Sequence, residues 1–157
     1  MSRASDLRAD FDASFARAPA DRERYVELLA IRLGGEPYAV LVADITSVHA
    51  DLEVVPLPAS ARELLGVAAI GTLIVPVYDL RAVVGAKQDG APRWTVVAKH
   101  GGAAYAFDGF DGTVRFSGVL AEQRSRGLRG VIERGDVRVP VIDILQISSA
   151  RGPSKEP

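Results

Sequence analysis

The sequence predicts an all-β protein made of two small, related β-barrels. Two strand-like phrases each occur twice along the chain, in the same order and at nearly equal offsets. Between them, short apolar segments alternate with Gly or Pro about every 8 to 12 residues. Many short strands with regular turn signals are typical of barrels and sandwiches.

The first repeated phrase is "GVAAIGTLIVPVYDL" at residues 66–80, which returns as "GVIERGDVRVPVIDI" at residues 130–144. Its glycines suit a tight turn with positive φ, because glycine has no Cβ to clash there. A proline inside a strand removes a hydrogen-bond donor, so Val-Pro-Val indicates a bent or edge strand. We expect the aspartate after it, Asp79 or Asp143, to cap the next turn rather than to carry chemistry.

The second phrase is "GGEPYAVLVAD" at residues 34–44, which matches "GGAAYAFDGFD" at residues 101–111. The repeating unit is roughly 65 residues, which is too long for a solenoid repeat. We therefore expect one domain over residues 25–148. Its subdomains would cover approximately residues 25–90 and 91–148, and an exchange of strands between them stays open.

Strand-like segments follow one another through this domain. They are "YVELLAIRL", "PYAVLVADITSV", "TLIVPVYDL", "RWTVVAKH", "AAYAFDGF", "TVRFSGVL" and "DVRVPVIDIL". The stretch "ASARELLG" at residues 59–66 is instead the best internal candidate for a helical turn.

The two ends of the chain differ from this pattern. Residues 1–24 form an arm in which Leu7, Phe11 and Phe15 are spaced four apart, as on one face of a short helix. A docked helix and a disordered arm are both compatible with it. Residues 149–157 are expected to form a loose tail.

Composition excludes several classes of function. The formal net charge is -1 and the pI is about 6.1, which argues against nucleic-acid binding. There is no cysteine, no apolar run long enough for a membrane span and no apolar core of a signal peptide. We expect a cytoplasmic protein with no cofactor and no metal, since His49 and His100 lack companions at ligand spacing.

The phrase "GGEPYAVLVADITSV…VVPLP…LLGVAAIGTLIVPVYDLR" resembles the CheW family of coupling proteins in bacterial chemosensory arrays. The resemblance implies two SH3-like five-stranded barrels side by side. It also implies a non-enzymatic, array-associated adaptor that bridges the cytoplasmic tips of methyl-accepting receptors to a histidine kinase.

Two departures from that family affect the expected function. The family has Asn-Leu-Arg-Gly before the Val-Pro-Val strand, where this chain has Ala69, Ile70, Gly71 and Thr72. The second unit has only "AEQRSRGLR" in a stretch that is longer in the family, so the second barrel is expected to be trimmed. We therefore expect a divergent adaptor that binds receptors or other CheW-like barrels, with kinase coupling weakened or lost. The alternative is an ordinary coupling protein.

By the same resemblance, a receptor groove would be lined by residues of two strands and the intervening loop. These residues are Ile45, Val48, Leu57, Gly71, Thr72, Leu73 and Val75. Because strand side chains alternate, about half of such a set is expected in the core. Separately, Arg124, Arg126 and Arg129 could form an electrostatic surface for an acidic partner, or simply a solvated charged face.

The sequence also bears on two other classes of function, an enzyme and a small-ligand-binding module. An enzyme is not indicated, because the sequence offers no nucleophile–base pair, no paired carboxylates and no phosphate loop. A small-ligand-binding β-barrel module stays open as a second alternative, with an apolar pocket between the barrels.

Overall fold

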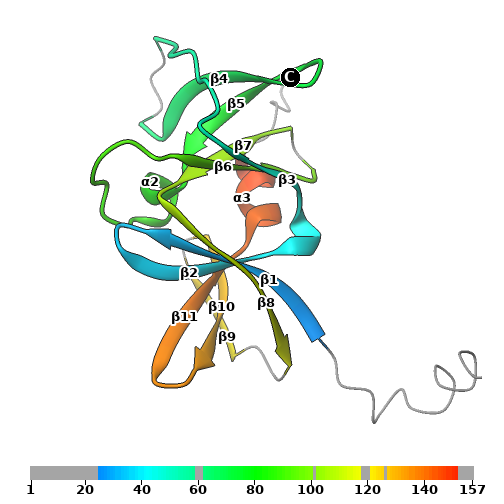
Figure 1. The fold of residues 1–157 in the computed structure, drawn as a ribbon, viewed down its shortest axis with the longest axis vertical. Coiled ribbons are helices and arrows are strands. Elements are labelled where there is room, and N and C mark those ends of the chain that lie inside the picture. Colours follow the sequence, from blue (N-terminus) through cyan, green and yellow to red (C-terminus); the bar gives the residue numbers. More distant parts are fainter. Residues whose placement is uncertain (1–24, 59–61, 101, 118–120, 126, 152–157) are drawn as a thin grey trace, which may run out of the picture.

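The computed structural model describes residues 25–58, 62–100, 102–117, 121–125 and 127–151 (Figure 1). Its strands form two curved sheets, which confirms an all-β protein of two small barrels. One sheet has five strands and takes all of them from a single stretch of chain; we call it the contiguous sheet. The other has six strands from two separate stretches, and we call it the split sheet.

The split sheet has the strand order β8-β1-β2-β11-β10-β9. Its strands are β1 (Tyr25–Leu33), β2 (Glu36–Leu41), β8 (Gly109–Ser117), β9 (Ala121–Ser125), β10 (Leu128–Arg134) and β11 (Val137–Ile142).

The contiguous sheet has the order β3-β6-β7-β5-β4. Its strands are β3 (Ile45–Ala50), β4 (Leu64–Ile70), β5 (Leu73–Asp79), β6 (Trp94–Ala98) and β7 (Ala104–Phe107). Three short helices complete the fold: η1 (Val42–Asp44), α2 (Leu80–Val84) and α3 (Ile144–Arg151).

The two halves of the sequence repeat exchange strands between the sheets. The hairpin β4–β5 pairs in parallel with β7, with Val77 opposite Ala104. The equivalent hairpin β10–β11 pairs in parallel with β2, with Val141 opposite Ala39. Each hairpin thus joins the Gly-Gly strand of the other unit. Neither sheet corresponds to residues 25–90 or 91–148 alone, because the split sheet spans residues 25–41 and 109–142, whereas the contiguous sheet spans 45–107.

The segment after β3 bridges the two edges of the contiguous sheet. Val55 exchanges two backbone hydrogen bonds with Val67 of the edge strand β4, at 2.7 and 2.9 Å. In the split sheet, β9 takes the corresponding place beside β10. The short stretch of the second unit therefore still contains a strand.

The main hydrophobic core lies between the two sheets. Alternation along β1 sends Leu29, Ile31 and Leu33 into this central cluster, where Tyr105 and Phe107 of β7 meet them. Leu28 points to the opposite, concave face of the split sheet, in a smaller cluster with Ile132 and Val139.

Two local predictions concern residues next to the hairpins, and the structure confirms one of them. Asp79 caps α2 by accepting a hydrogen bond from the Arg81 amide, and Asp143 accepts one from the Gln146 amide, as the repeated phrase predicts. The helical turn expected at residues 59–66 is wrong where the structure describes it, because Leu64–Ile70 pairs with β5 as strand β4. Packing against the neighbouring strand here outweighs the helix propensity of the local sequence.

The predictions for the two ends of the chain are tested only in part. The arm at residues 1–24 lies outside the described residues. At the other end, α3 extends to Arg151, so the expected loose tail does not begin at residue 149. Among the described residues, no helix is long and apolar enough to cross a membrane.

Candidate functional site

The hairpin β4–β5 projects beyond its sheet, at the opposite end of the molecule from the hairpin β10–β11 (Figure 1). Its strand β5 pairs with β7 only from Val77 onward, so residues 73–76 have β4 as their one strand neighbour in the described part of the chain. At the end of this overhang, residues 73 and 74, both faces meet solvent. Leu73 and Ile74 are consequently 65% and 68% exposed, although they are successive residues of one strand.

A second exposed apolar segment lies against this hairpin. Val55 and Leu57, which follow β3, are 53% and 46% exposed. We call Val55, Leu73 and Ile74 together the apolar tip, because the antiparallel bridge of Val55 to Val67 directs Leu57 away from the hairpin turn. A groove of about 320 Å³ lies within it, and its lining includes Val55, Val67, Ala69 and Ile74. Large exposed apolar side chains gathered beside a groove are typical of a protein–protein contact.

The structure places only part of the predicted receptor groove at this tip. Gly71, Thr72 and Leu73 are exposed there, whereas Val75 is buried in the core. Leu57 is exposed too, but it follows Val55 on the side away from the hairpin turn. Ile45 and Val48 lie elsewhere: they belong to β3, at the other edge of the sheet, and pack against the central cluster.

Sequence reasoning missed Val55 and Ile74 of the apolar tip. Strand alternation predicts that only one of Leu73 and Ile74 is exposed. Both are exposed because β7 begins only at Ala104, opposite Val77, and no local sequence pattern shows where this neighbouring strand begins. The only available signal was the run of large apolar residues directly after a glycine turn.

The second copy of the hairpin has a charged end instead of an apolar one. By the repeat offset, Leu73 and Ile74 correspond to Val137 and Arg138. Val137 is 48% exposed, and Arg138 forms an ion pair of 3.9 Å with Glu133 across the hairpin. The two tips therefore present different chemistry at opposite ends of the molecule.

Of the three arginines predicted to form an electrostatic surface, the structure describes the side chain of Arg129. The side chain of Arg124 and all of Arg126 lie outside what the structure describes. Arg129 is partly buried and lies 3.8 Å from Asp44, measured from its Nη1 to the carboxylate Oδ2. The charge of Arg129 is therefore partly neutralised within the protein by Asp44.

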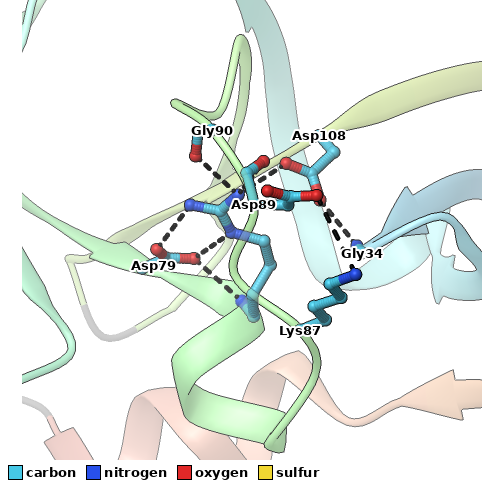
Figure 2. Close-up of polar contacts among 7 residues, drawn as sticks. Gly34, Asp79, Lys87, Asp89, Gly90 and Asp108 are labelled. Atoms are coloured by element: carbon cyan, nitrogen blue, oxygen red, sulfur yellow. Dashed lines mark hydrogen bonds and ion pairs between the residues drawn. The ribbon is translucent and has the colours of Figure 1, made fainter.

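A buried ionic cluster joins the two sheets on one side (Figure 2). The guanidinium of Arg81 donates to Asp79 at 2.8 and 2.9 Å and to Asp108 at 2.8 Å. It also donates to the Gly90 carbonyl at 2.9 Å. Asp108 in turn accepts a 2.7 Å hydrogen bond from the amide of Gly34, in the β1–β2 turn. The hydrogen bond to Asp79 raises the pKa of Arg81 further, so its charge is permanent. The cluster thus ties the end of β5 to a turn of the split sheet.

A second junction between the sheets contains a carboxylate that is less well satisfied. Asp44, in η1, is only 4% exposed, and its Oδ2 has no hydrogen-bond partner in the described part of the chain. Burial raises the pKa of Asp44, and the nearby Asp143 raises it further. The pKa of Asp44 is lowered, to a smaller extent than burial raises it, by the nearby Arg129, Lys99 and His100.

We expect Asp44→Asn to increase stability near neutral pH, by about 1 kcal/mol, because an ionised group no longer has to be desolvated. The folded-state pKa lies above the ordinary 3.8, so folded protein keeps this proton over a range where unfolded chain has lost it. Stability therefore falls as pH rises from 3.8 through the folded-state pKa, and the variant should lose that dependence. Urea unfolding between pH 3.5 and 7 measures both effects.

The matched control is Asp136→Asn, which removes a carboxylate from an exposed turn. It should leave the acid-range slope of the wild-type protein intact. An Asp44→Asn variant less stable than wild type at neutral pH would show that the contact with Arg129 outweighs desolvation.

The fold and the apolar tip define a two-barrel protein with the surface of a binding module. Comparison with family models matches the CheW-like domain over residues 27–152, and the chain belongs to this family. Family membership supports a scaffold or adaptor role in chemotaxis signalling. A search of curated proteins finds no match.

A solved structure shares the fold. It is the scaffolding protein TtCheW from Thermoanaerobacter tengcongensis, with a TM-score of 0.70 at 16% sequence identity. The match covers 76% of this chain and 90% of that protein.

Proposed function

We propose that this protein is a non-enzymatic scaffold of a bacterial chemosensory array, in the cytoplasm, and that its apolar tip binds the cytoplasmic tip of a methyl-accepting receptor. The observation that carries the proposal is the exposure of Leu73 and Ile74 on a hydrogen-bonded hairpin. Solvating two large apolar side chains is unfavourable, and covering them with a partner recovers that free energy.

The chemistry of the apolar tip suits a helical partner. An amphipathic helix offers apolar side chains at i, i+3, i+4 and i+7, which can lie along a groove edged by a hairpin. Leu73 and Ile74 stand beside the groove that Val55 and Val67 line. Other CheW-like barrels are a second class of partner for the same surface.

Kinase coupling is proposed to be weakened or lost. The resembled family has an arginine where this chain has Gly71, and that residue lies in the exposed turn of the hairpin. The tip therefore lacks the cation that could pair with an acidic group on a kinase. The connection between β9 and β10 is also short. The alternative is an ordinary coupling protein that binds both receptor and kinase.

Leu73→Asp and Ile74→Asp should each weaken binding to a receptor signalling tip by about tenfold or more, because the new carboxylate must be desolvated in the contact. The measurement is a titration of the full chain with a receptor tip fragment, followed by calorimetry. Thermal melting of each variant checks that exposed substitutions leave the fold intact.

Val137→Asp is the matched control, since it makes the same change at the equivalent exposed site of the other hairpin. Its receptor affinity should stay within twofold of wild type. Equal losses in all three variants, or in none, would contradict the assignment of the receptor to the apolar tip. A tight complex with the regulatory domain of the kinase would favour an ordinary coupling protein.

A further inference from the structure

The concave face of the split sheet has a hollow of about 620 Å³ that the adaptor role does not use. Its floor consists of Ala30, Ala39, Val114, Ile132 and Val139, which come from five different strands. The space between the two sheets, where the sequence suggested a ligand pocket, holds the central cluster instead. The hollow thus lies inside one barrel.

The hollow exists because small side chains line that end of the barrel. Ile132, Val139 and their neighbours fill the middle of the concave face, whereas Ala30 and Ala39 leave space toward the hairpin turns. Small barrels usually fill their interior with side chains, and those that do not can hold one small ligand. A volume of 620 Å³ lies within the usual range of small-molecule sites.

Cationic side chains stand at the rim of this hollow. Arg32 forms an ion pair of 2.9 Å with Asp111, which neutralises it. Arg134 lines the hollow without an ion-pair partner among the residues that the structure describes. Its neighbour on the same hairpin, Arg138, is instead paired with Glu133. Of the charged side chains that line the hollow, Arg134 is thus the one without an ion-pair partner in the described part of the chain.

We propose that this hollow binds a small amphipathic anion, a carboxylate with a short aliphatic chain, and that Arg134 holds the carboxylate. Arginine matches a carboxylate in a bidentate, charge-assisted geometry. The aliphatic chain would lie against Ala30 and Val114, the half-buried members of the floor. The proposal does not depend on the adaptor role, and it would give the protein a chemical input of its own.

The strands β2 and β11 separate beside the hollow. They pair with each other only at Val141–Ala39 and Ile142–Val40, so among the described residues 36–38 and 137–140 have no strand neighbour on their facing sides. A peptide strand needs such a free edge, and it is the competing occupant. The apolar floor and the arginine without an ion-pair partner favour the amphipathic anion.

Octanoate is the probe, titrated into the full chain and followed by 1H–15N chemical shifts. We expect saturable shifts at the residues of the floor. Arg134→Gln should weaken octanoate binding by about tenfold, as loss of a charge-assisted pair predicts. Arg138→Gln removes the same charge from the same hairpin and should change affinity less than twofold. The neutral analogue 1-octanol should bind wild type more weakly than octanoate, and should not discriminate wild type from Arg134→Gln.

Ala30→Leu is a second variant that fills the floor and should abolish binding. If it fails to fold, the comparison of Arg134→Gln with Arg138→Gln still decides. Absence of saturable shifts, shifts confined to the apolar tip, or equal losses in the two arginine variants would overturn the proposal. So would binding of octanol as tight as that of octanoate.

Discussion

Arg81→Met is expected to lower the free energy of unfolding by about 3–5 kcal/mol, the usual cost of removing one partner from a buried ion pair. The side chain of Asp79 is 6% exposed, and among the described residues only the amide of residue 81 would still donate to it. Asp108 would keep the Gly34 amide but lose the guanidinium, and the Gly90 carbonyl would lose the guanidinium as well. Urea unfolding at pH 7, followed by circular dichroism, measures the loss.

Arg32→Met is the control for this change, because it breaks an ion pair whose side chains are 51% and 46% exposed. Exposed pairs contribute about 0–1 kcal/mol, so this variant should be close to wild type. Equal unfolding free energies for the two variants would contradict a structural role for the buried cluster. The comparison also tests whether the link between β5 and the turn at Gly34 stabilises the pairing of the two sheets.

Gly66→Ala is the second change with a large expected effect, a loss of at least about 3 kcal/mol. A Cβ at this position would lie 2.1 Å from the carbonyl oxygen of Val55. The segment at Val55 would have to move, and its two hydrogen bonds with Val67 would break. The same movement would displace part of the apolar tip. Thermal and urea unfolding measure the stability, and receptor titration measures the second effect.

Gly109→Ala is the control, since its new Cβ would have its nearest contact at 3.4 Å, with a flexible arginine side chain. Its backbone also lies outside the left-handed region. We expect a change below about 1 kcal/mol. A Gly66→Ala protein as stable as this control would show that the bridge between Val55 and β4 is dispensable.

The repeated phrases predicted the two-barrel architecture, but they did not predict which strands lie next to each other. Two barrels and the capping role of Asp79 follow from local chemistry. The exchange of hairpins does not, because alternation tells which face of a strand is apolar but not which strand lies beside it. The pairing of Val141 with Ala39 joins residues that are far apart in the chain.

The candidate site could be predicted only where a local signal existed. Leu73 followed from the family resemblance and lies at the apolar tip, whereas Leu57, predicted with it, is exposed away from the hairpin turn. Ile74 was missed because its exposure follows from where a neighbouring strand begins. The cluster of Arg81 was missed for a similar reason. Its near partner Asp79 is visible in "YDLR", but Asp108 is 27 residues further along the chain.

The split sheet has a consequence for the order in which the protein can fold during synthesis. All strands of the contiguous sheet have been made once Phe107 has left the ribosome. Strands β1 and β2 are made before the contiguous sheet but wait for β8 and β11, their partners on the outer sides, until Ile142 has been added. Until then, the hairpin β1–β2 exposes apolar faces and free edges, which favour wrong pairing. A hairpin that is translated before the contiguous sheet is thus completed after it.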